Sequence, residues 1–472
     1  MTDSLEIHDL RSALSVLERR GQTVAHINTP IDPNLDLLSD YLAAYRTATN
    51  SVMSAEQPLR LYRKPRTGAF SVLLGVFGSR ANTRMFLDPQ GRHGSEVCNA
   101  ELVCRAIMHP IAPVMVRPAA ERVVLENPDV HTLLPALTCS VGDPGPTITL
   151  GMVYARDERS GASNCSVHRI TIKPASVAIA IYPGGDLQRL IDLHTQRGER
   201  LSVSVNIGMD PAIYIAAALS KPALGFGDDE LGVAGAIRGR GVELAPCYSN
   251  AGRFVEHAEI VLEASLGTEM EPESSLGDAH SMPEYLGYYS PCGEVSTLRV
   301  SALSHRPGAV YQALSGPGRE QSELLGAGQE ASILRLLSEW GMSTWIKDIV
   351  AQPAGGGHLL TVLQVAKSCE ADDRLVRQLT QRLLEAISST KNIVLLDEDV
   401  NPHSAEDVLW AMSTRFRAEM DIHPTRPLPG TPLDPTLSSL YCSGEFTGEA
   451  PKSVFDCTVP FTLRPRFRRA FA

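Results

Sequence analysis

The middle of the chain, roughly residues 120–310, constrains the fold most, because short β-branched runs recur there between Gly and Pro turns. Few of these runs alternate with helical periodicity, whereas a parallel sheet needs a long crossover, usually a helix, between its strands. We therefore expect a mostly antiparallel sheet or a split β-barrel, and not a Rossmann array. The expected strands are residues 147–154, 166–172, 177–182, 201–207, 259–263 and 296–301.

The segment before this sheet indicates mixed α/β structure. Asp9 can cap a first helix that ends at Gly21. A strand at residues 23–27, a helix near 35–46 and a strand at 70–74 follow, and prolines between residues 110 and 118 suggest an extended linker. The apolar residues at helical spacing in the first helix are Leu10, Ala13, Leu14 and Leu17.

The last third of the chain returns to α/β order. Strands are expected at residues 359–365 and 392–396, and Ser404 can cap a helix that begins after the second of them. Five prolines between residues 424 and 435 predict an extended, loop-rich tail. The helix expected at 374–387 has its apolar face at Leu375, Leu379, Leu383 and Ala386.

Composition excludes several classes of protein. The net charge of −11 argues against binding to nucleic acid through phosphate attraction. No apolar run is long enough for an integral membrane segment, and residues 1–9 lack the apolar core of a signal peptide, so we expect a cytoplasmic protein. Nine cysteines without any C-x-x-C pair argue against a disulfide framework and against a thiolate zinc site.

Three local patterns imitate known motifs without matching them. The glycines at 355–357 precede a strand and lack the Lys-Ser/Thr pair of a phosphate-binding loop, so a turn is expected. The acidic run at 397–401 opens like a calcium loop, but Pro402 stands where such a loop needs Gly and Val408 where it needs Glu. Gly232, Gly235 and Gly239 do not have dinucleotide-binding spacing.

The remaining candidates for chemistry lie in the middle segment. Asn164 to Arg169 read Asn-Cys-Ser-Val-His-Arg and follow a turn of small residues, Glu230 lies in a Gly/Ala-rich stretch, and Glu273 and Asp278 bracket Ser-Ser-Leu-Gly. Each has an ordinary alternative: Arg169 as a surface ion pair, for example, or Glu273 as part of a solvated acidic loop. Residue type alone does not decide between these roles.

The order and spacing of these pieces resemble the UbiD family of prenylated-FMN-dependent decarboxylases along nearly the whole chain. The matching pieces are the opening helix after Asp9, residues 72–79, 147–151, 160–169 and 255–263, Pro272-Glu273 with Gly277-Asp278, residues 391–400, 407–411 and 414–415, and Leu433-Asp434-Pro435. The resemblance implies a multidomain α+β or α/β fold. It implies an N-terminal α/β domain at 1–115, a central split-barrel flavin-binding domain at 116–315 and a C-terminal α/β oligomerisation domain and tail at 316–472.

The resemblance also implies a cofactor site. Prenylated FMN would bind through its phosphate with Mn2+ and K+, because an anion left on an sp2 carbon needs an electron sink that side chains do not supply. Asn164 and Glu230 would be metal ligands. Either Asp186 would replace the His that some members use as a further ligand, or there would be no third ligand, as in other members. The other implied cofactor contacts are Ser166, Val167, His168, Arg169, Pro183, Gly184, Gly185 and Lys391.

The same resemblance assigns the catalytic residues. Arg169 would clamp the substrate carboxylate, Glu273 would hold Arg169, and Asp278 would protonate carbon after CO2 leaves. Between Asp278 and Gly287 the chain carries extra residues, 279–286, which include His280 and Glu284 and are expected to reshape the substrate pocket. Strand alternation puts Asn164 and Arg169 on opposite faces, so the cofactor must wrap the strand or a bulge must intervene.

These implications lead to a non-oxidative, reversible decarboxylase of an α,β-unsaturated or aromatic acid. Alternatives are a carboxylase running in reverse within a larger assembly and a flavin-binding member without turnover. A natural-product role, such as forming a terminal alkene from a polyketide acid, is one expectation for the substrate. The expected partners are a UbiX-type flavin prenyltransferase as cofactor supplier and a second copy of the chain in a homodimer or higher oligomer.

Overall fold

The computed structural model describes residues 5–46, 55–219, 222–274, 281–431, 434–437 and 448–470. The chain divides into two compact units. The first comprises Met1–Arg92, Arg105–Leu219 and Leu224–Leu324, and the second comprises His93–Cys104, Ser220–Ala223 and Leu325–Ala472. The expected three-domain division stays a prediction. None of the described helices is both long and apolar enough to cross a membrane, and the eight described cysteines are free.

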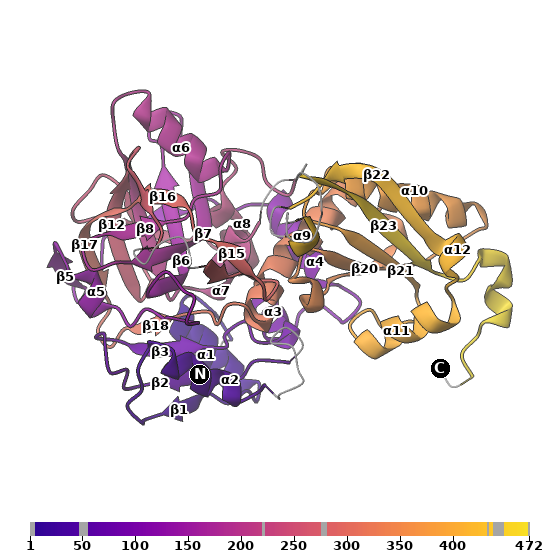
Figure 1. Ribbon diagram of the computed structural model, residues 1–472, viewed down its shortest axis with the longest axis horizontal. Coiled ribbons are helices and arrows are strands. Elements are labelled where there is room, and N and C mark those ends of the chain that lie inside the picture. Colours follow the sequence, from indigo (N-terminus) through magenta and orange to yellow (C-terminus); the bar gives the residue numbers. More distant parts are fainter. Residues whose placement is uncertain are drawn as a thin grey trace. The chain divides into compact units, whose positions relative to one another are not determined.

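A large antiparallel sheet forms the centre of the first unit (Figure 1). Its order over the described residues is β13-β16-β8-β7-β6-β9-β12-β17-β5, and each neighbouring pair is antiparallel. The expected antiparallel architecture is therefore confirmed. The strands are β5 (Val123–Glu126), β6 (Thr147–Arg156), β7 (Ser163–Ile172), β8 (Val177–Ile179), β9 (Leu201–Ile207), β12 (Ile260–Leu266), β13 (Met270–Pro272), β16 (Glu294–Thr297) and β17 (Arg299–His305).

One strand prediction in this sheet is wrong. Residues 296–301 were expected to form a single strand, but they contribute to β16 and then β17, which pair with β13 and β12 respectively. The break falls at Leu298, which is buried and whose amide donates to the carbonyl of Val177. A buried apolar residue at a strand corner leaves no turn signal in the sequence, so periodicity alone joins the two strands.

Three helices position the residues of the sheet that matter for the site. α6 (Asp186–Thr195) packs Leu187, Leu190 and Ile191 into the same core cluster as the Val and Ile side chains of β9. α7 (Pro211–Ala217) and α8 (Glu230–Arg238) contact each other and β7. Gly235 of α8 must be glycine, because a Cβ there would lie 2.5 Å from the carbonyl oxygen of Ile111. Gly235 therefore reflects close packing, whereas Gly239 is the left-handed C-cap of α8.

The N-terminal part of the first unit forms a second, smaller sheet. Its order is β1-β2-β3-β18, and β18 pairs with β3 in parallel although about 240 residues separate them. α1 begins as predicted at a capping box between Asp9 and Ser12, but Val16 is buried where Leu14 was expected. The elements are α1 (Leu10–Arg19), β1 (Ala25–Ile27), α2 (Asp36–Ala43), β2 (Arg60–Tyr62), β3 (Ser71–Leu74), α3 (Arg80–Leu87) and β18 (Val310–Gln312).

Short elements complete the first unit, and two helices span its boundaries along the chain. β4 (Val114–Met115) lies within the expected linker and pairs with β10 (Glu243–Pro246), which also pairs with β11 (Arg253–Val255). β14 (Ser281–Pro283) and β15 (Tyr289–Pro291) form a hairpin. The remaining helices are α4 (Asn99–Met108), α5 (Val130–Leu133) and α9 (Arg319–Glu339).

The second unit is a sheet covered on both faces (Figure 1). Alternate strand residues explain this, because Leu363 and Leu395 pack with α10 whereas Val362 and Val394 pack with α11. The order in the described part is β19-β20-β21-β23-β22. The elements are β19 (Ile346–Ala351), β20 (Leu360–Val365), α10 (Ala371–Ala386), β21 (Asn392–Asp397), α11 (Ala405–Thr414), α12 (Ala418–Asp421), β22 (Ile422–Pro429) and β23 (Glu449–Cys457).

One sequence prediction fails in this unit. The buried face of α10 passes through Val376, Leu379 and Leu383, whereas Leu375 is 39% exposed and Ala386 is also exposed. The proline-rich stretch, expected to be extended and loop-rich, begins with the extended strand β22. β22 lies at the sheet edge, where missing N–H groups are tolerated, and its pairing shifts register between Pro424 and Pro427.

Candidate active site

Strand β7 carries a chain of hydrogen bonds along one face. Asn164 Nδ2 donates to Ser166 Oγ at 2.7 Å, and Ser166 Oγ lies 2.7 Å from His168 Nε2. His168 Nδ1 lies 2.9 Å from the carbonyl oxygen of Ala180, so Nδ1 carries the proton and Nε2 accepts from the Ser166 hydroxyl. Burial lowers the pKa of His168, which keeps the ring neutral. In this series of hydrogen bonds, the amide nitrogen of Asn164 donates to Ser166. The amide oxygen of Asn164 takes part in none of these bonds and is therefore available for a cation.

Beside this series of hydrogen bonds, part of one edge of β7, its free edge, has no paired strand among the described residues. β8 pairs with β7 only from Ile170 to Ile172, and among the described residues no strand pairs with residues 163–168 on that side. By strand alternation Arg169 faces away from Asn164, Ser166 and His168. A bulge does occur, but on β6, where Ile148 pairs with Ile170 and Gly151 with His168. A ligand along the free edge of β7 can therefore reach residues of both faces.

Glu230 lies against this edge at the start of α8. Its Oε2 accepts from the amide of Cys165 at 3.1 Å, and Asp229 caps the helix by accepting from the amide of Leu231. Burial, together with the charges of Asp229 and Asp186, raises the pKa of Glu230 to about 8. Asn164 and Glu230 therefore offer oxygen donors on contacting segments, and Asp186 lies near enough for its charge to act on Glu230. Among the described residues, no group of three or more His, Cys, Asp or Glu side chains is arranged to hold a metal ion.

The turn predicted to face the flavin directly precedes α6. Pro183 and Gly184 form the turn, Gly184 has φ of +76°, and Gly185 is the N-cap of the helix that Asp186 begins. The turn lies close to His168, because Ala180, which accepts from the His168 ring, is three residues before Pro183. The structure thus brings the predicted turn next to the predicted cofactor strand.

Arg169 joins two carboxylates that come from distant parts of the chain. Nε donates to Glu273 Oε1 at 2.7 Å and Nη2 donates to Glu273 Oε2 at 2.8 Å, while Nη1 donates to Glu284 Oε1. The Glu273 side chain is 1% exposed and that of Arg169 is 26% exposed. Burial alone would lower the pKa of Arg169, but hydrogen bonding and charge from Glu273, with the charge of Glu284, raise it.

The predicted pairing of Arg169 with Glu273 is present, and Glu284 is a third member that the residue pattern did not assign. Glu284 directly follows β14, within the stretch between Asp278 and Gly287 that was expected to reshape the pocket. Its only sequence signal was that it is acidic and lies in these extra residues. Asp278 lies outside the described residues.

Lys391 belongs to the second unit. Its Nζ forms an ion pair with Asp434 Oδ2 at 2.9 Å and donates to Thr436 Oγ1 at 2.5 Å. Its assignment to the cofactor phosphate stays a prediction.

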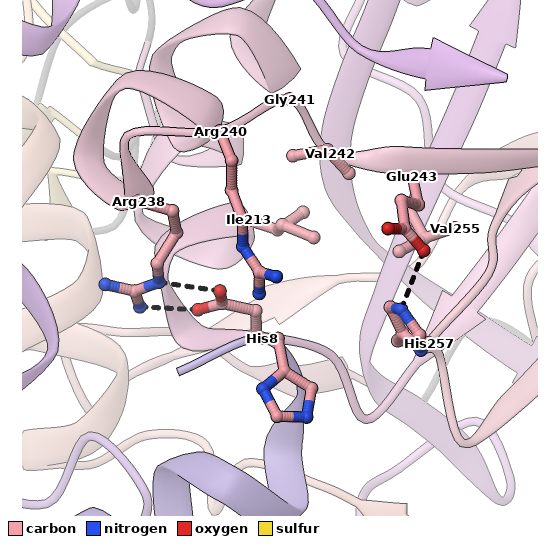
Figure 2. Close-up of a pocket in the computed structure, with 10 residues that line it drawn as sticks. His8, Ile213, Arg238, Arg240, Gly241, Val242, Glu243, Val255 and His257 are labelled. Atoms are coloured by element: carbon pink, nitrogen blue, oxygen red, sulfur yellow. Dashed lines mark hydrogen bonds and ion pairs between the residues drawn. The ribbon is translucent and has the colours of Figure 1, made fainter. Parts of the chain in front are cut away.

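A separate pocket in the first unit is lined by acidic and basic side chains that pair with one another (Figure 2). Arg238 forms a bidentate ion pair with Asp210 at 2.5 and 2.7 Å, and His257 Nε2 lies 2.9 Å from Glu243. Arg240 donates to the carbonyl of Ile7 at 3.3 Å. With a cavity volume of about 30 Å³, the pocket has room for water but not for an organic acid. It ties α8 and β10 to the N-terminal segment.

Comparison with known proteins identifies the family. The family model for the Rift-related domain of 3-octaprenyl-4-hydroxybenzoate carboxy-lyase matches residues 114–319, and that for the C-terminal domain of this enzyme matches residues 322–457. The gallate decarboxylase of Lactiplantibacillus plantarum is 30% identical, over 98% of this chain and 96% of that protein. The chain belongs to the UbiD family. The expected family and the expected activity class, carboxy-lyase, are both confirmed.

Solved UbiD-class structures share the fold. The 3,4-dihydroxybenzoic acid decarboxylase of Klebsiella pneumoniae matches with a TM-score of 0.89 and 32% identity, over 99% of this chain and 97% of that one. The UbiD-class enzyme HmfF of Pelotomaculum thermopropionicum, solved in complex with FMN, matches with a TM-score of 0.84 and 26% identity, over 98% and 97% of the two chains. The expected fold, a multidomain α/β protein with a split-barrel sheet, is thereby confirmed.

Proposed function

We propose that this UbiD-family protein is a prenylated-FMN-dependent decarboxylase of a hydroxylated aromatic carboxylic acid. The substrate class is supported by the relatives, which are described as decarboxylases of gallate and of 3,4-dihydroxybenzoic acid. The observation that carries the proposal is the bidentate pair between Arg169 and buried Glu273 beside the cofactor strand. The reaction breaks the bond between the ring carbon and the carboxylate, releases CO2 and forms a C–H bond with one proton from the protein.

Arg169 binds the substrate carboxylate in this proposal. Glu273 accepts from Nε and Nη2, which fixes the plane of the guanidinium, and the N–H groups that neither Glu273 nor Glu284 uses, one on Nη1 and one on Nη2, can bind a second planar acceptor. Because the Glu273 side chain is only 1% exposed, water competes little for this pair. The guanidinium is therefore held in one orientation before substrate arrives, which lowers the entropic cost of orienting the acid.

The residues along the free edge of β7 fit the cofactor. Asn164 presents an amide oxygen and Glu230 a buried carboxylate, with Asp186 nearby, and such hard donors suit Mn2+ and K+ beside a phosphate. Ser166, Val167 and His168 would contact the flavin from the strand, and Pro183, Gly184 and Gly185 from the turn. When bound, prenylated FMN supplies the electron sink for the carbanion that CO2 loss creates.

On the basis of the family resemblance, we assign Asp278 as the residue that donates the proton to the ring carbon. A carboxyl that donates a proton near neutral pH must be held protonated, by burial or by neighbouring negative charge. Glu273 supplies such a charge in the same segment of the chain. Asp278→Asn is expected to fold and to bind cofactor while losing turnover.

The proposal includes the circumstances in which the protein works. A flavin prenyltransferase would supply the cofactor, two or more copies of the chain would associate, and the reaction would take place in the cytoplasm.

Co-production with a flavin prenyltransferase, with Mn2+ supplied, tests the proposal. Bound prenylated FMN is expected in the absorbance spectrum, and the loaded protein is expected to release CO2 from 3,4-dihydroxybenzoate or gallate. Arg169→Gln should abolish release, because it removes the cation that holds the carboxylate. Retention of unmodified FMN only, or release unaffected by Arg169→Gln, would refute the assignment.

A further inference from the structure

Every nitrogen of the Arg169 guanidinium already has a carboxylate partner. Glu273 accepts from Nε and Nη2, and Glu284 accepts from Nη1. One N–H remains on Nη1 and one on Nη2, so a substrate carboxylate that binds both of these nitrogens shares Nη1 with Glu284. Glu284 presents to Arg169 the same functional group that the substrate would present.

The charges at the site oppose the simultaneous binding of Glu284 and a substrate carboxylate to Arg169. Arg169 contributes one positive charge, while Glu273 and Glu284 contribute two negative charges when both are ionised. A substrate carboxylate would bring three anions around one cation, in a place where the Glu284 side chain is 18% exposed and Glu273 1%. Like charges at such short range repel strongly when water is scarce.

The β14–β15 hairpin sets the position of Glu284. The Glu284 amide donates to the carbonyl of Tyr288 at 2.8 Å, and the Gly287 amide donates to the carbonyl of Glu284 at 2.8 Å. Gly287 has φ of +81°, which allows this tight tip, and Tyr285 beside Glu284 is 4% exposed. Glu284 is thus held in place by a closed turn and a buried neighbour.

We propose that Glu284 competes with the substrate carboxylate for Arg169 and so sets the affinity of the enzyme for its acid. This inference rests on the proposed function, in which Arg169 is the carboxylate clamp. Glu284 is a specificity-determining residue here, not a catalytic acid, because its partner is Arg169 and not the reacting carbon. Glu284 accepts from one nitrogen of Arg169 and is 18% exposed, whereas Glu273 accepts from two and is 1% exposed, so Glu284 is the easier of the two partners to displace.

The competition predicts a particular kinetic change. Without the Glu284 charge the acid binds more tightly, whereas the chemical step, which takes place after Glu284 has been displaced, is unchanged. We expect KM for 3,4-dihydroxybenzoate to fall about five- to tenfold in Glu284→Gln and Glu284→Ala, with kcat within about twofold, since a partly exposed ion pair is worth about 1 kcal/mol.

Calorimetry on the full chain, with and without added FMN, gives a test that does not need turnover. The probes are 3,4-dihydroxybenzoate and catechol, its product without the carboxylate. The Kd of the acid should fall about five- to tenfold in both Glu284 variants, and the Kd of catechol should not change. Glu294→Gln is the matched control, because Glu294 is exposed on β16, opposite Pro272, and is not a partner of Arg169.

The outcomes separate this inference from the proposed function. If the acid binds the Glu284 variants no more tightly than the wild type, or if acid and catechol affinities change alike, the competition is refuted. A fall in kcat with unchanged KM also refutes it, since that result would make Glu284 part of the chemistry. If Arg169→Gln leaves the Kd of the acid unchanged, the proposed clamp itself is wrong.

Discussion

The Arg169→Gln substitution tests the central electrostatic feature of the site through stability as well as activity. It removes the bidentate bonds of 2.7 and 2.8 Å to Glu273 and the bond to Glu284. Removing one partner of a fully buried ion pair costs about 3–5 kcal/mol. Because Arg169 is 26% exposed, water can replace part of the lost hydrogen bonding. We therefore expect the free energy of unfolding of the first unit to fall by about 2–3 kcal/mol.

The pH dependence of this loss has a definite sign. Burial raises the pKa of Glu284 and the Arg169 charge opposes the rise, so in the variant the folded-state pKa moves further above the unfolded value. Such a group stabilises the fold below the unfolded pKa and loses that contribution as pH rises through the folded pKa. The difference in free energy of unfolding between wild type and variant, which we call the stability gap, should therefore be small near pH 4 and larger at pH 8.

Urea unfolding followed by circular dichroism at pH 4.5, 6 and 8 measures the gap. Arg159→Gln is the matched control, because Arg159 pairs with Glu199 on the surface, with side chains 65% and 39% exposed. The control should change stability by less than about 1 kcal/mol at each pH. Equal losses in the two variants, or a gap for Arg169→Gln that does not change with pH, would refute the reasoning.

Three further predictions follow from other parts of the structure. Glu230→Gln should lower retention of Mn2+ and flavin at least about tenfold, as seen by metal analysis and flavin absorbance, and retention at the wild-type level would exclude Glu230 as a ligand. Leu379→Ala should lower the free energy of unfolding, measured in urea, by about 2–4 kcal/mol, and Leu375→Ala should lower it by less than about 0.5 kcal/mol. Equal decreases in the two variants would contradict the observed buried face of α10. Burial lowers the pKa of Lys452 to about 8, so as pH rises the folded protein loses this proton before the unfolded chain does. The free energy of unfolding of the wild type, relative to that of Lys452→Met, should therefore rise between pH 8 and pH 10.

Local signals predicted most of the secondary structure. Gly and Pro turns around β-branched runs located β6, β7 and β9, because turn residues act on the backbone wherever they stand. Capping residues located α1 and α11 for the same reason. The face of α10 was misplaced because Leu375 and Val376 are both apolar, and 100° of rotation around the helix separates neighbouring residues.

The site was predictable only where its residues lie in one motif. Asn164, Ser166 and His168 alternate along a single strand, so a strand prediction alone puts them on one face. Glu284 meets Arg169 across 115 positions of sequence, and that contact depends on a hairpin whose placement no local pattern determines. The family resemblance supplied Glu273 as the partner of Arg169, but it said nothing of a carboxylate in residues that this chain adds.

The parallel pairing of β18 with β3 has a consequence for how the protein is made. β3 ends at Leu74, and its partner β18 begins only at Val310, so a chain still on the ribosome carries an unfilled sheet edge through the synthesis of more than 230 further residues. Edges of this kind recruit other strands, and a chain waiting for a distant partner is exposed to aggregation meanwhile. A fragment that contains β3 and stops before Val310 keeps that edge open permanently, so expression of residues 1–309, or of the N-terminal segment alone, should yield insoluble material.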